Sequence, residues 1–193
     1  MDSSIIITFA IPLFFGLILI EFFYGVITKQ NNYRINDAIT SMSLGLISRF
    51  VPILGLGFQY VVYKAVAEHY NLKLLSGEET WVWVTAFILY DICYYWMHRI
   101  HHEIKVFWAT HVVHHHGEEF NLATALRQTS TGFLWKWVFF LPLFIIGIPP
   151  QMYVTVAGLN LVYQFWVHTE HIGRLGFLAV SYTHLRAHET KSY

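Results

Sequence analysis

The sequence has 193 residues, of which 55% are hydrophobic and 12% charged, whereas roughly a quarter is charged in a typical soluble protein. This composition excludes a disordered chain, and a single cysteine, Cys93, excludes a disulfide scaffold or a cysteine-based metal cluster. The net charge is zero with histidine neutral, so we expect no nucleic-acid partner. Histidine is unusually frequent, since its twelve copies equal lysine and arginine together.

Apolar segments dominate the chain. A membrane-spanning helix needs about 20 mostly apolar residues. The candidates, in chain order, are residues 5–27, 41–66, 81–97, 133–148 and 151–167. The last two flank Pro149 and Pro150, which favours a tight connection between antiparallel helices. We therefore expect an all-α, multi-pass membrane helix bundle of about five membrane helices. The alternative, a buried bundle in a soluble protein, is disfavoured by the low charge.

Basic residues follow every second apolar segment. They are Lys29 and Arg34 after the first, Arg99, Lys105 and Arg127 after the third, and Arg174 after the fifth. Because positive loops stay in the cytoplasm, this alternation places the histidine-rich segments on the cytoplasmic side. We expect an integral protein of a bacterial inner membrane, or of the endoplasmic reticulum in a eukaryote. Residues 116–132 could form a helix at the membrane interface or a polar loop, and the pattern does not decide.

Histidines gather directly after the third apolar segment, with seven in residues 98–116. Spacings of three and four put several on shared helix faces, and such faces build metal sites in helical bundles. Neutral imidazole is the commonest metal ligand, and it suits Fe, Zn, Cu or Ni. The candidate ligands are His98, His102, His111, His114, His115 and, after the fifth segment, His168. The sequence leaves the roles of His101, His116 and His171 open.

Two carboxylates accompany the histidines. Asp91 lies two helical turns before His98 on the same face, where it could orient a ligand imidazole or bind tyrosine hydroxyls. Glu103 follows His102 and could orient a ligand or handle a proton. Histidines that cap helix ends, or that bind anionic lipid, are the structural alternatives. A membrane metal-binding or metal-transport protein is the functional alternative, although no internal repeat supports a transporter.

Three stretches resemble a known family, the fatty acid hydroxylase / sterol desaturase superfamily. Residues 91–103 resemble its first histidine box, and residues 107–115 with 119–128 resemble its second. Residues 164–170 are similar to a further stretch of the branch that includes alkylglycerol monooxygenase and many bacterial sterol-desaturase-like proteins. The resemblance covers about residues 80–176.

The resemblance implies a cytoplasmic di-iron site that uses O₂ and two electrons to attack a C–H bond of a sterol, fatty acyl or ether lipid. It makes His98, His102, His111, His114 and His115 iron ligands, and His168 a further one. Zinc has no redox chemistry and would not serve. No flavin or nicotinamide motif is present, so electrons would come from an electron-transfer partner or a reduced pterin. The lipid substrate and the choice between hydroxylation and desaturation stay open.

The end of the chain departs from the family pattern. The family's third box, His-x-x-His-His, is missing, and residues 181–193 look like a translated sequencing adapter. We therefore expect residues 1–180 to be one membrane-embedded domain, incomplete at its C-terminal end, and residues 181–193 to be a non-native tail. His184 and His188 are not counted as ligands. The parent protein would be the oxygenase, and this chain itself would be inactive.

Overall fold

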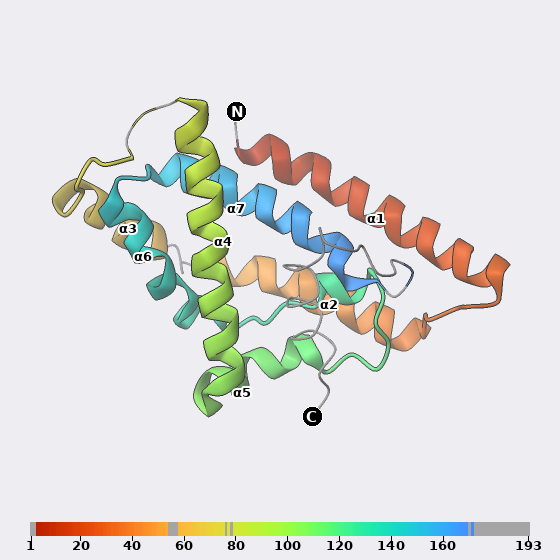
Figure 1. Cartoon of the computed structure of the whole chain (residues 1–193). Coiled ribbons are helices and arrows are strands. Elements are labelled where there is room, and N and C mark those ends of the chain that lie inside the picture. Colours follow the sequence, from red (N-terminus) through yellow and green to blue (C-terminus); the bar gives the residue numbers. More distant parts are fainter. Residues whose placement is uncertain (1–2, 54–57, 76, 78, 170, 172–193) are drawn as a thin grey trace.

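A computed structural model describes residues 3–53, 58–75, 77, 79–169 and 171 (Figure 1). Every regular element within these ranges is helical, as the all-α expectation requires. The α-helices are α1 (Ser3–Thr28), α2 (Ile35–Ile53), α3 (Phe58–His69), α4 (Thr80–Glu103), α5 (Lys105–His115), α6 (Leu141–Ile146) and α7 (Pro150–Phe165). Short 3₁₀ helices are η1 (Thr124–Leu126), η2 (Gly132–Leu134), η3 (Lys136–Phe140) and η4 (Trp166–His168).

Helices α1 and α7 run side by side, and α4 crosses α7 (Figure 1). Two apolar cores hold this arrangement. One core joins α3, α4, α6 and α7, with Val82, Phe144 and Val156 almost fully buried. The other joins α1, α7 and the segment before η1, where the rings of Phe14 and Phe165 stack with centroids 4.0 Å apart. The lower end of α4 leads directly into α5 (Figure 1).

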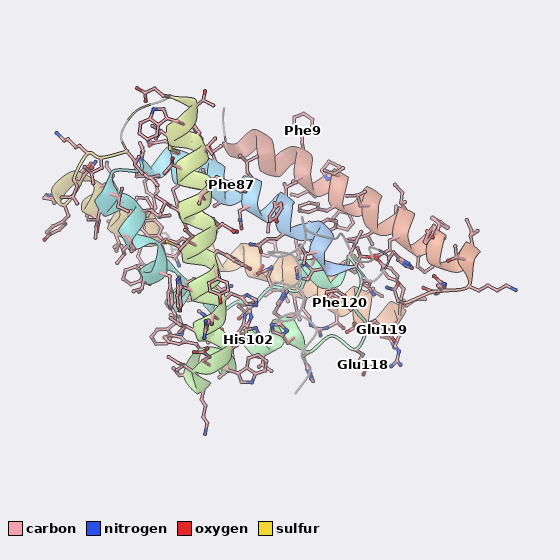
Figure 2. The ribbon with its side chains drawn as sticks, in the orientation of Figure 1. Phe9, Phe87, His102, Glu118, Glu119 and Phe120 are labelled. Atoms are coloured by element: carbon pink, nitrogen blue, oxygen red, sulfur yellow. The ribbon has the colours of Figure 1, made fainter. Side chains whose placement is uncertain are left out.

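The outer faces of several helices are apolar. Among the described residues, one helix is long and apolar enough to cross a membrane, over Phe9–Thr28 of α1. Phe9 points away from the bundle and is 72% exposed (Figure 2). Ile47 on α2 and Ile88 on α4 are also exposed. Extended apolar surface of this kind marks contact with lipid or with another protein.

The helices differ from the five expected spans. Segment 41–66 contains the end of α2 and most of α3, and residues 54–57 between them lie outside the described residues. Segment 133–148 is a succession of η2, η3 and α6 instead of one long helix. Pro142 starts α6, and Gly147, with φ of +125°, ends it. Mean hydropathy over a window does not register these helix breakers.

Two local expectations have clear outcomes. The tight connection exists, because only residues 147–149 separate α6 from α7 and Pro150 is the first residue of α7. Residues 117–131 form a loop that contains the single turn η1, and not an interfacial helix. This loop is buried over residues 121–125, which a surface loop would not be. The expected tail, residues 181–193, and Arg174 lie outside the described residues.

Candidate metal centre

Four histidines form the one group of histidine, cysteine or acidic side chains in the described part of the chain that could hold a metal ion. His98 and His102 come from α4, and His111 and His115 come from α5. One ring nitrogen from each of the four lies within 4.8 Å of the others. The Nε2 atoms of His98 and His102 are 3.1 Å apart, and those of His111 and His115 are also 3.1 Å apart. We call these four residues the histidine cluster.

The turn between α4 and α5 brings the two pairs together. Ile104 alone separates the helices, and at its extended backbone (φ −106°, ψ 120°) the chain turns sharply from α4 into α5 (Figure 1). Each pair has a spacing of four residues, so each lies on one face of its own helix. This turn brings the two faces together, and His102 lies at the lower end of α4 (Figure 2).

The cluster is chemically suited to a metal ion. His98 and His111 are buried, and His102 and His115 are half-buried. Burial, reinforced by the neighbouring His98, His114 and His115, lowers the pKa of His111 well below its usual range. A neutral imidazole that offers its nitrogen lone pair is the form that binds metals. The donor set therefore fits a transition-metal ion that accepts nitrogen ligands.

A second pair of histidines lies beside the cluster. The Nε2 atoms of His114 and His168 are 3.4 Å apart. His114 Nδ1 donates to the carbonyl of Arg127 (2.7 Å), and His168 Nδ1 donates to the carbonyl of Gln164 (3.1 Å). With a proton on each Nδ1, each Nε2 carries a lone pair that a metal ion could accept. We call His114 and His168 the histidine pair.

Two carboxylates, of Asp37 and of the buried Glu21, hold in place the segments that support the histidine pair. Arg127 forms a 2.8 Å ion pair with Asp37 of α2, with side chains 6% and 13% exposed. Glu21 of α1 accepts hydrogen bonds from Tyr33, from Thr169 and, at 2.8 Å, from the backbone N–H of Leu122. Thr169 directly follows His168, so α1 holds the end of η4 in place.

Our sequence analysis missed both of these carboxylates. A signal was present for Glu21, because it is the single charged residue in the apolar segment 5–27. Asp37 and Arg127 are 90 positions apart, and nothing local in the sequence connects them. The sequence pattern of the loop also gave no indication that Arg127 is buried.

The remaining candidates lie outside the cluster. His101 is 1% exposed, its Nδ1 donates to the carbonyl of Met97 (2.7 Å), and burial lowers its pKa. His116 is exposed, and the ring of His171 contacts Tyr24. Glu103 forms a 2.8 Å ion pair with Arg99 on the exposed side of α4.

Asp91 lies on α4 two helical turns before His98, where α4 contacts α7. Its Oδ1 accepts a hydrogen bond from Asn160 Nδ2 of α7 (3.1 Å), and no histidine is among its partners in the described part of the chain. Asp91 therefore connects two helices instead of contacting a ligand ring directly.

An apolar cavity reaches the histidine pair. It has a volume of about 190 Å³, and its wall includes Ala10, Phe14, Met42, Phe165, His114 and His168. These residues come from α1, α2 and α7 as well as from the segments that carry the pair. We call this space the apolar cavity. Its lining is mostly apolar, and its polar side chains besides the two imidazoles are Tyr94, Gln128 and Gln164, so it suits an alkyl chain.

Comparison with known proteins gives matches over most of the chain. A family model described as fatty acid hydroxylase matches residues 83–193. Alkylglycerol monooxygenases of Homo sapiens and Danio rerio are each 38% identical over 187 residues, which is 95% of this chain and 42% of each relative. The alkylglycerol monooxygenase of Caenorhabditis elegans is 28% identical over 176 residues, which is 89% of this chain and 35% of that relative.

The chain spans less than half the length of these curated relatives. No solved structure matches it significantly. The family match begins within α4, so it includes the histidine cluster and the histidine pair but not α1 and α2.

Proposed function

Because the chain belongs to the fatty acid hydroxylase family, we propose that it carries the histidine site of an O₂-dependent di-iron lipid oxygenase. The convergence of four imidazoles within 4.8 Å is the observation that carries this proposal. The names of the relatives point to an ether lipid of the alkylglycerol type as substrate. Hydroxylation is accordingly favoured over desaturation.

The proposed ligands fall into two groups. The histidine cluster would hold one iron ion through His98, His102, His111 and His115. The histidine pair, His114 and His168, would contribute ligands to the second ion. Bound iron would supply the redox chemistry that activates O₂, which zinc cannot supply.

The protein's own residues would bind and orient the lipid. The apolar cavity would hold the alkyl chain against α1, α2 and α7, with the histidine pair in its wall. Burial of this pair, with His114 9% and His168 7% exposed, keeps bulk water away from the reacting carbon. Exclusion of water protects a reactive centre from side reactions.

We assign the two expected carboxylates different parts in this scheme. Asp91 would act as a positioning residue through Asn160, and not as a direct partner of an imidazole. Glu103 would fix the end of α4 next to His102 through its ion pair with Arg99. Neither role requires contact with the substrate.

The proposal includes a multi-pass membrane location with the histidines on the cytoplasmic side. It is supported by the apolar helix Phe9–Thr28, by the exposed apolar side chains of α2 and α4, and by the alternation of basic residues. Electrons would come from an electron-transfer partner or a reduced pterin, because the sequence has no flavin or nicotinamide motif.

The test is oxidation of a lipid with labelled oxygen. Membranes that contain the iron-loaded chain are supplied with a reduced pterin, an alkylglycerol and ¹⁸O₂, and products are analysed by mass spectrometry. With the wild-type chain we expect ¹⁸O in the lipid product, a result that would overturn the expectation, drawn from the missing third histidine box, that this chain is inactive. With His98→Ala we expect no labelled product. His69→Ala is the matched control, because His69 is exposed on α3 and bonds only its own helix. Iron uptake into vesicles without oxidation would instead support metal transport.

A further inference from the structure

A second and larger cavity adjoins the apolar one. It has a volume of about 360 Å³, within the range of small-molecule sites. Both cavities are lined by Tyr94, Gln128, Leu161 and Gln164, so these four residues form a shared wall. Tyr94 also stacks on the ring of His98, with centroids 5.9 Å apart, so the wall lies next to the histidine cluster.

The lining of this second cavity is mixed, with more polar side chains than the apolar cavity has, beside aromatic and apolar residues such as Phe133 and Phe140. It includes Gln59, Thr129, Ser130, Lys136, Tyr153 and Asn160, besides the shared wall. No carboxylate is among its described lining residues, and Lys136 is the one cation there. Hydroxyl and amide groups can bind an uncharged polar ligand, whereas the lysine disfavours a positively charged one. We call this space the polar cavity.

A chain of hydrogen bonds fixes the direction of the amides in the wall. Asp91 Oδ1 can only accept when ionised, so Asn160 must present its NH₂ group to it, at 3.1 Å. The carbonyl oxygen of Asn160 then faces the other way and accepts from Gln164 Nε2, at 2.6 Å. The amide oxygen of Gln164, Oε1, is therefore the acceptor left at the end of this series of hydrogen bonds. That oxygen accepts no hydrogen bond from the described residues.

Gln128 is arranged in a similar way. Its Nε2 is directed at the carbonyl of Ala125, at 3.5 Å, and its Oε1 accepts nothing from the described part of the chain. Two amide oxygens thus stand at the boundary between the cavities. An oxygen acceptor in a buried wall is satisfied only by a ligand or water that donates a proton, such as a hydroxyl group.

We propose that the polar cavity binds the head group of the lipid whose alkyl chain lies in the apolar cavity, and that Asp91, through Asn160 and Gln164, selects an uncharged head group with a free hydroxyl. The site rests on the proposed function, since it assigns a subsite to the same lipid. Asp91 is here a positioning residue, because it acts through two amides and does not contact the ligand.

Binding of matched lipids tests the proposal without turnover. The purified chain in detergent is titrated with a hexadecylglycerol that has both hydroxyls free and with the same lipid O-methylated at both positions. Bound lipid is measured by native mass spectrometry. We expect the wild type to bind the hydroxyl form about tenfold more tightly, the effect of one or two lost hydrogen bonds. A hexadecyl lipid with a trimethylammonium head group should bind more weakly than the hydroxyl form.

The variant Asp91→Asn tests the direction of the amides. Asparagine can donate as well as accept, so Asn160 and Gln164 are free to reverse, and the preference for the hydroxyl lipid should fall to within about twofold. Asparagine has the shape of aspartate, so we expect the fold to be retained. Glu68→Gln is the matched control, because it removes one carboxylate charge from an exposed ion pair on α3. The control should keep the tenfold preference.

The outcomes separate this proposal from the proposed function. Equal binding of both lipids by the wild type, or a preference unchanged by Asp91→Asn, overturns the subsite whether or not any lipid is oxidised. Selective binding that Asp91→Asn abolishes supports the subsite, even if the iron-loaded chain oxidises no lipid. In that last case the oxygenase proposal alone fails.

Discussion

The histidine cluster and the histidine pair are neighbours that are assembled in opposite ways. The cluster needs only two consecutive helices, two spacings of four residues and one extended residue, Ile104, between them. The pair joins the end of α5 to η4, which lies 54 residues later in the chain. Local geometry therefore forms the cluster, whereas tertiary contacts form the pair.

The supports of the two groups differ in the same way. In the cluster, each 3.1 Å contact joins two imidazoles of one helix. In the pair, the imidazole of His114 donates to the carbonyl of Arg127 in the loop after α5, and that of His168 donates to the carbonyl of Gln164 at the end of α7. Glu21 of α1 and Asp37 of α2 hold those segments, and both lie outside the family match. The two N-terminal helices are thus part of how the second group is positioned.

The largest expected effect is on metal affinity, which should distinguish the histidine cluster from the histidine pair. His98→Ala should weaken Co(II) binding to the cluster by more than about 100-fold, since even outer partners of metal ligands change affinity by 10–100-fold. His168→Ala should leave the first equivalent of Co(II) unchanged and weaken only later equivalents. A titration followed by visible absorption measures both. Equal loss of the first equivalent in the two variants would show that the groups are not separable.

The next effect concerns the buried ion pair that supports His114. Arg127→Met leaves Asp37 buried without its partner, which should lower the free energy of unfolding by about 3–5 kcal/mol. The double variant Arg127→Met, Asp37→Leu should recover most of this loss, because it removes both charges.

Unfolding by denaturant in detergent measures this prediction. Arg34→Met is the control, since Arg34 and its partner Glu118 are 63% and 67% exposed and the pair contributes little. No recovery in the double variant would mean that Arg127 matters through contacts other than its charge.

A smaller effect is expected at Glu21. Glu21→Leu removes the acceptor for three buried donors and should lower the free energy of unfolding by about 2–3 kcal/mol. Glu21→Gln keeps an oxygen acceptor and should lose less than half of that.

His168 should also become more reactive toward diethyl pyrocarbonate in Glu21→Leu but not in Glu21→Gln, because Thr169 loses its anchor. Mass spectrometry of the labelled peptides measures this reactivity, with His98 as an internal reference. Increased labelling of both histidines would indicate general unfolding, which contradicts a specific role for Glu21.

The smallest expected effect is a pH dependence of stability that comes from Tyr33, the residue that donates a hydrogen bond to Glu21. Burial, followed by the hydrogen bond and charge of Glu21, raises the pKa of Tyr33 above its usual value near 10. Above pH 10 the unfolded chain therefore loses this proton while the folded chain keeps it, so stability falls as pH rises. Tyr33→Phe should decline less steeply between pH 10 and 11, by a fraction of one proton. Identical slopes for the two proteins would contradict the shift.

The contrast between the groups also explains what the sequence could predict. Spacings of four residues revealed His98 with His102 and His111 with His115, because helix periodicity is local. His114 and His168 were each expected as ligands, but nothing in the sequence predicted that their Nε2 atoms face each other. Hydropathy predicted an all-helical chain but not its division into helices, since the expected span 133–148 is a succession of η2, η3 and α6 with Pro142 in the first turn of α6 and Gly147 after its end. The support from Asp37 and Glu21 depends on contacts about 90 to 150 residues apart and has no local pattern.

Iron bound by the histidine cluster is the central claim, and X-ray absorption at the iron edge tests it most directly. The purified chain is loaded anaerobically with one equivalent of Fe(II), beside His98→Ala and the control His69→Ala. The account predicts strong imidazole scattering from the wild type and His69→Ala, and a clear reduction in His98→Ala. Iron surrounded by oxygen donors, with the same spectrum in all three proteins, would contradict the account.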